Sequence, residues 1–118
     1  MSENKACAKI YRKEIGSHSK VQGSFKYAPI TIISGQMKYI LKQPLQCTSE
    51  KEDGYFVIHS AMLGVIGTGL TKNEAAKSFA QEFDFVYKRL NSLDGESLTN
   101  NNQMIKNLLN QIVEKVEQ

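Results

Sequence analysis

Residues 53–90 decide the fold of this chain, and they read DGYFVIHSAMLGVIGTGLTKNEAAKSFAQEFDFVYKRL. Asp53-Gly54 at the start predicts a tight β-hairpin turn, because glycine adopts a positive φ angle without a steric penalty. The strand that follows, residues 55–59, is apolar on both faces, which is typical of a central strand covered by a helix. Gly64 then indicates a turn, and residues 65–68 indicate a short third strand.

A helix follows this strand, and Thr71 and Glu74 form a capping box at its start. The Thr71 hydroxyl can accept a hydrogen bond from the Glu74 amide, and the Glu74 carboxylate can reach back to the Thr71 amide. Phe85 falls outside the apolar pattern, so we expect it to be exposed. Apolar residues at three- and four-residue spacing form one buried stripe: Ala75, Ala76, Phe79, Ala80, Phe83, Val86, Tyr87 and Leu90.

Strands are also expected upstream of the turn. Residues 45–49 alternate apolar and polar side chains, so they predict the strand that pairs with residues 55–59. Residues 30–33 and 37–41 are strand-like and flank Ser34-Gly35, which favours a second hairpin. Pro44 ends the second of these strands, because proline cannot donate a hydrogen bond to a sheet.

The C-terminal residues predict one more helix, which we expect to run to the end of the chain with Thr99 or an asparagine as its cap. Its apolar stripe consists of Met104, Ile105, Leu108, Leu109, Ile112, Val113 and Val116. The whole pattern predicts an α+β fold: a three- to four-stranded, mainly antiparallel sheet with one main helix on one face, plus this C-terminal helix. We divide the chain into a poorly ordered basic segment (1–28), the α+β domain (29–96) and the C-terminal helix (97–118).

Composition and charge narrow the functional classes. The chain has 118 residues and is 41% hydrophobic, which suffices for one modest core. Residues 1–28 hold six Lys or Arg against two Glu, but these are scattered, so we expect a solvated tail and no direct binding of nucleic acid. No apolar run is long enough to span a bilayer, and no secretory signal is evident, so a cytoplasmic protein is expected.

Candidate catalytic and metal-binding residues do not form a recognisable set. Cys7 and Cys47 are not part of a Cys-x-x-Cys motif or a Cys/His cluster, so we expect no metal site and no cofactor. Asp53, Glu74 and Asp84 fall in a turn, a helix cap and a helix flank, whereas two-metal hydrolysis needs converging carboxylates. We therefore expect no enzyme.

Two further sets of residues resemble functional sites by composition. Cys47 and His59 are expected to be cross-strand neighbours, but such a pair usually belongs to an ordinary sheet surface. The glycines of Gly64-x-x-Gly67-x-Gly69 match no phosphate-binding signature and are interpreted as turn residues.

The order of hairpin, third strand, glycine and capped helix is accompanied by a spaced set of residues over positions 45–90. The set comprises Asp53, Gly54, Tyr55, Met62, Gly64, Gly69, Thr71, Glu74 and Ala75. In this order and spacing the segment resembles the small domain of HicB-type antitoxins, which implies a partial ribonuclease H-like fold. The family's Pro-Asp-Leu-Pro is replaced by Ser60-Ala61-Met62-Leu63, and residues 91–118 offer no basic DNA-recognition face.

The resemblance implies a non-catalytic domain that binds and neutralises a small RNA-cleaving toxin. The expected partner-binding surface is the sheet face opposite the helix together with the 62–64 loop: Tyr55, Val57, His59, Met62 and Gly64. The altered loop leaves an alternative open, a stand-alone regulatory or structural domain without a toxin. In either case we expect a homo-oligomer formed through a sheet edge or through the C-terminal helix.

Overall fold

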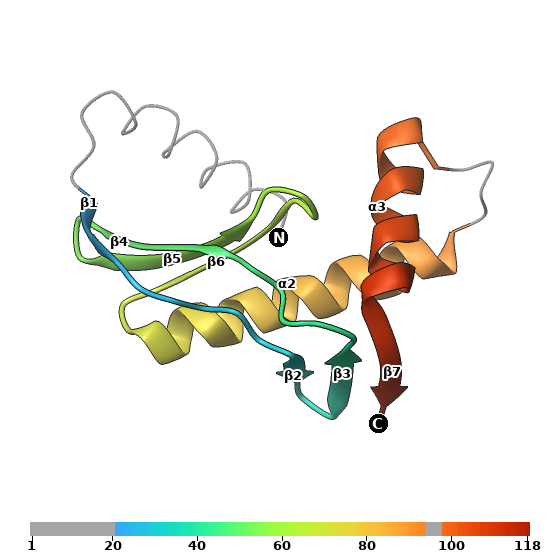
Figure 1. Ribbon diagram of the computed structural model, residues 1–118, viewed down its shortest axis with the longest axis horizontal. Helices are drawn as coiled ribbons and strands as arrows, with labels where there is room; N and C mark the ends of the chain where they lie inside the picture. The colour runs from blue at the N-terminus through green and yellow to red at the C-terminus, as the bar shows by residue number, and fades with distance from the viewer. Residues whose placement is uncertain (1–20, 94–97) are drawn as a thin grey trace.

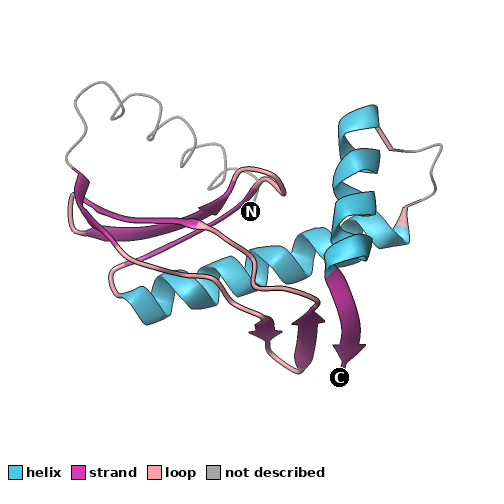
Figure 2. Ribbon diagram, viewed as in Figure 1, coloured by secondary structure: helices cyan, strands magenta, loops and turns pink. Residues whose placement is uncertain are grey.

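The chain folds into two antiparallel sheets and two helices over residues 21–93 and 98–118, which a computed structural model describes (Figure 1 and Figure 2). The predicted α+β class is confirmed, with one long main helix packed on a sheet and a second helix near the C-terminus. The elements in chain order are β1 (Val21–Ser24), β2 (Thr31–Ser34), β3 (Met37–Leu41), β4 (Thr48–Glu52), β5 (Tyr55–Ser60), β6 (Val65–Gly69), α2 (Lys72–Ser92), α3 (Asn100–Ile112) and β7 (Val113–Glu117).

The first sheet has the order β1-β4-β5-β6, and its β4–β5 hairpin closes at the predicted turn. Asp53 and Gly54 have φ angles of 49° and 83°, and Glu52 pairs directly with Tyr55. Positive φ at both central residues is the signature of a two-residue type I′ turn. Because the turn is this short, β4 runs on to Glu52, and it starts at Thr48 instead of the predicted residue 45.

Helix α2 begins as predicted, with the Thr71 hydroxyl accepting a hydrogen bond from the Glu74 amide at 3.0 Å. The helix then packs on β6 at very short range. A Cβ atom added to Gly67 would lie 2.6 Å from the Ala75 carbonyl oxygen, and one added to Gly69 would lie 2.6 Å from the Ala75 amide nitrogen. The interpretation of Gly67 and Gly69 as turn residues is therefore wrong: both lie within β6, where their lack of a side chain lets the helix backbone approach the strand.

The second sheet has the order β2-β3-β7. Its β2–β3 hairpin confirms the predicted pairing of residues 30–33 with 37–41. The expectation of a helix to the end of the chain is wrong beyond Ile112, because the last residues pair with the open edge of β3 as strand β7. The Lys42 amide donates to the Ile112 carbonyl at 2.9 Å, and β-branched Val113 is buried opposite Leu41. Backbone pairing with a distant strand thus outweighs the local helical pattern.

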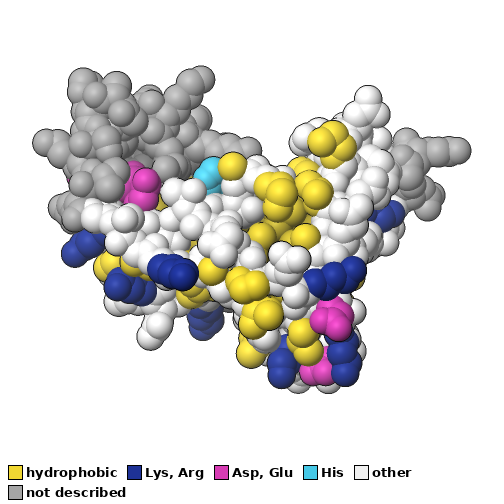
Figure 3. Space-filling view, viewed as in Figure 1, with side chains coloured by type: hydrophobic (Ala, Val, Ile, Leu, Met, Phe, Trp, Pro, Cys, Tyr) yellow, Lys and Arg dark blue, Asp and Glu magenta, His cyan; other side chains and the backbone are white. Residues whose placement is uncertain are grey.

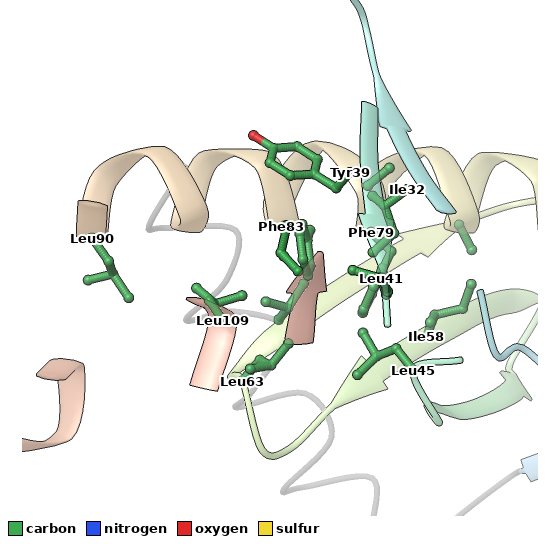
Figure 4. Packing of buried hydrophobic residues seen from close by; sticks show 14 residues of the cluster. Ile32, Tyr39, Leu41, Leu45, Ile58, Leu63, Phe79, Phe83, Leu90 and Leu109 are labelled. Atoms are coloured by element: carbon green, nitrogen blue, oxygen red, sulfur yellow. The ribbon is translucent and has the colours of Figure 1, made fainter. Parts of the chain in front are cut away.

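The core lies between α2, the first sheet and the second sheet (Figure 4). Five residues of the predicted stripe on α2 are buried: Ala75, Phe79, Ala80, Phe83 and Leu90. Tyr39 from β3 and Leu109 from α3 are fully buried in the same cluster. Phe85 is 51% exposed, as predicted from its position outside the stripe.

The predicted basic N-terminal segment falls mostly on residues 1–20, which lie outside the described residues, as do residues 94–97. Its last part belongs to the folded domain, because β1 pairs with β4 and the residues after it pack on the core. The Phe25 ring meets the Phe56 ring at 5.7 Å, and the Tyr27 ring meets the Phe79 ring at 5.9 Å. Neither described helix is long and apolar enough to cross a bilayer.

Candidate protein-interaction site

Three of the predicted partner-binding residues lie on β5, on the face of the strand that points away from the core. Successive side chains of a strand point to opposite faces. Phe56 and Ile58 belong to the cluster packed under α2, so Tyr55, Val57 and His59 lie on the face opposite the helix, as expected. The β4 register places Glu52, Glu50 and Thr48 beside these three residues on the same face.

The exposure of these residues separates those that a partner can contact from those that it cannot. Tyr55 is 49% exposed and Met62 is 52% exposed, whereas Val57 is only 4% exposed and His59 is half-buried. A contiguous apolar patch indicates an interaction surface, whereas a single exposed apolar side chain is ordinary. Tyr55 and Met62 are the accessible side chains of the predicted set, and Val57 is not accessible to a partner.

The β5–β6 loop holds Met62 between two anchored neighbours. The Ser60 hydroxyl accepts a hydrogen bond from the Leu63 amide at 3.3 Å, and the Ser60 carbonyl accepts one from the Gly64 amide at 2.8 Å. Leu63 is 1% exposed, and Gly64 has a φ angle of 69°, a conformation that favours glycine. Serine hydrogen bonds and a buried leucine thus fasten this loop, which has no proline.

Helix α3 adds an apolar surface that is not among the predicted partner-binding residues. In Figure 1 the β5–β6 loop lies at the end of the first sheet nearest α3, and Figure 3 shows hydrophobic side chains gathered in the hollow between them. On α3, Met104 is 62% exposed and Leu108 is half-buried, while Lys106 is the only charged residue of the helix. The predicted apolar stripe of this helix includes Met104 and Leu108. Helical spacing alone does not show which residues of the stripe remain exposed to solvent.

The carboxylates considered for catalysis are held in separate structural contacts. Asp53 lies in the hairpin turn, and the Glu74 carboxylate accepts a hydrogen bond from the Leu70 amide at 2.9 Å instead of the predicted Thr71 amide. Asp84 accepts a hydrogen bond from the Tyr39 hydroxyl and forms an ion pair with Lys88 at 3.4 Å. Within residues 21–93 and 98–118, no three His, Cys, Asp or Glu residues are grouped to hold a metal ion.

The predicted cross-strand pairing of Cys47 with His59 is wrong by one residue, because His59 pairs with Thr48. Cys47 precedes β4, and its thiol contacts the Leu45 carbonyl at 3.5 Å. Burial raises the pKa of the Cys47 thiol to about 11, so the thiolate needed for nucleophilic chemistry is scarce at neutral pH.

The residues of the spaced motif divide into two groups. Asp53 and Gly54 form the hairpin turn, and Gly69 and Thr71 form the junction of β6 with α2, where Ala75 is buried. These residues hold the scaffold together, while Tyr55, Met62 and Met104 supply accessible apolar surface. The chain was compared with family models, with curated proteins and with solved structures, and it matches none of them.

Proposed function

We propose that this chain is a non-catalytic protein-interaction domain of the HicB antitoxin type, which binds and neutralises a small RNA-cleaving toxin in the cytoplasm. The observation that supports it is the 52% exposure of Met62, on a loop fastened by Ser60 and Gly64. The loop that carries Met62 borders the hydrophobic hollow beside α3 (Figure 3). A contiguous apolar patch fits a binding role, and methionine is enriched at protein interfaces. The Met62 position is also where the HicB-like pattern has its apolar loop residue.

The chemistry of this surface favours apolar docking over charge recognition. Residues 60–64 contain no ionisable side chain, and α3 contributes Lys106 alone. We define the docking surface as the β5–β6 loop around Met62 and the hollow between this loop and α3, which receives the partner. Complete burial of one such apolar side chain contributes about 1.5–3 kcal/mol, so burial of Met62 would contribute measurably to the affinity.

Co-expression with the product of a neighbouring small gene tests the proposal. The two proteins should elute together from gel filtration, and the chain should suppress RNA cleavage by the toxin. Met62→Glu should abolish both effects, because it places a charge in an apolar contact. Phe85→Glu is the matched control, since Phe85 is 51% exposed on α2 and lies outside the docking surface. Equal binding by the Met62→Glu variant and the wild type would contradict the proposal.

The alternative function is a stand-alone regulatory or structural domain of the same fold. The observation that favours it is the loop sequence Ser60-Ala61-Met62-Leu63, which lacks the prolines and the aspartate of the HicB-like pattern. A chain that has no toxin-like neighbour and forms only assemblies of itself would support this alternative.

A further inference from the structure

The outer edge of β2 carries backbone groups that no described strand uses. β2 is an edge strand of the second sheet, where it pairs with β3 alone. The Leu41 amide donates to the Ile30 carbonyl at 2.8 Å, and the register continues with Ile32 opposite Tyr39. Because alternate residues of an antiparallel strand direct their N–H and C=O groups to opposite sides, those of Thr31 and Ile33 point away from β3.

The side chains of β2 leave this edge without the usual protection. Natural sheets guard an open edge with charged residues, prolines or bulges. Strand β2 reads Thr-Ile-Ile-Ser, has a regular register with β3, and is flanked by Ile30, which is 50% exposed, while Ile33 is 59% exposed. The other edge of the same sheet, β7, carries Glu114, Lys115 and Glu117, and the last two form an ion pair at 3.1 Å. The charged side chains of β7 therefore disfavour pairing with a further strand at that edge, whereas the uncharged side chains of β2 do not.

We propose that β2 pairs antiparallel with β2 of a second copy of this chain. A two-fold axis beside Ile32 would bring Thr31 of each copy opposite Ile33 of the other. In that register, every outward N–H and C=O group of Thr31 and Ile33 finds a partner on the second copy, so the strand is complementary to itself. The absence of charge within β2 means that two identical strands meet without electrostatic repulsion.

This pairing joins two three-stranded sheets into one continuous sheet and covers the exposed Ile33 side chains. It is independent of toxin binding, because the Met62 loop belongs to the first sheet. A dimer with this geometry thus leaves the docking surface of each copy available.

Sedimentation of the full chain over a range of concentrations tests the pairing. The wild type should form a dimer, and Ile33→Lys should shift the population to monomer, because it places charge at the shared edge. Met104→Lys is the matched control on α3 and should leave the dimer intact. A wild type that remains monomeric, or a dimer lost in Met104→Lys but kept in Ile33→Lys, overturns the proposal.

Amide hydrogen exchange of the wild type tests the same pairing without a variant, in case Ile33→Lys does not fold. The amides of Thr31 and Ile33 should be protected at concentrations where the dimer forms and should lose that protection on dilution. The Ile32 amide faces β3, so it should remain protected throughout. Fast exchange at Ile33 in a sample shown to be dimeric would place the interface elsewhere.

Discussion

The Tyr39 hydroxyl donates a hydrogen bond of 2.5 Å to the Asp84 carboxylate and so ties β3 of the second sheet to α2. The Tyr39 ring is fully buried and meets the rings of Phe83 and Tyr87 edge-on, at 5.3 Å and 4.9 Å. Lys88 lies on the other side of Asp84, at 3.4 Å. The second sheet is therefore attached to the main helix by both aromatic packing and a polar contact.

Tyr39→Phe should lower the free energy of unfolding by about 1–3 kcal/mol, because the Asp84 carboxylate loses its buried donor. The Asp84 side chain is only 16% exposed, so water replaces that donor poorly. Denaturant unfolding measures the loss. Tyr55→Phe serves as the control, since Tyr55 is 49% exposed. Equal stabilities of the wild type and Tyr39→Phe would show that the hydrogen bond contributes nothing.

Alkaline pH should destabilise the wild type more than Tyr39→Phe. Burial, followed by the hydrogen bond and the charge of Asp84, raises the pKa of Tyr39 above its ordinary value of 10.0. The folded state therefore holds the phenolic proton more tightly than the unfolded state does. The resulting stabilisation is complete below pH 10 and decreases as the pH rises above it. Unfolding free energies of both proteins from pH 8 to 11 should converge; parallel curves would contradict this assignment.

Gly67→Ala should destabilise the chain by about 1–3 kcal/mol through overpacking. The new methyl group would meet backbone atoms of Ala75 and Phe79 in α2, which cannot rotate out of the way. Gly23→Ala in β1 is the matched control, because a Cβ atom there meets nothing within 4 Å. Thermal unfolding of the two variants should show a large decrease in Tm for the first and little change for the second. Similar melting temperatures would show that α2 shifts freely on β6.

Cys47 should react slowly with thiol reagents in the folded protein. Its pKa of about 11 leaves little thiolate at pH 8, and its side chain is half-buried. The experiment uses a Cys7→Ser variant, so that Cys47 supplies the whole signal. Labelling should accelerate strongly in denaturant. A rate in the native state close to that of a free thiol would show that Cys47 is more open than its burial indicates.

Short-range patterns in the sequence were sufficient for strands β4 to β6 and the main helix, but not for β1, which lies in the segment expected to be poorly ordered. The Asp53-Gly54 turn, the Thr71 cap and the stripe through Phe79 and Phe83 each depend on residues a few positions apart. Local backbone preference and side-chain periodicity determine such features directly. For the candidate site, the expectation of a partner surface on β5 and the Met62 loop came from the resemblance, and the structure adds that Tyr55 and Met62 are exposed while Val57 is buried.

The tertiary structure alone decided the features that join distant segments. Val113 and Val116 fit a helical stripe, yet they form strand β7 because β3, more than 70 residues earlier in the chain, offers an open row of backbone partners. Gly67 fits a turn in the sequence, but its structural role is to let the backbone of α2 approach β6. The hollow beside the Met62 loop exists only because α3 folds back beside the first sheet (Figure 1). Local periodicity determines which side chains share a face of a helix or strand. Long-range backbone pairing and close packing determine which other element that face packs against.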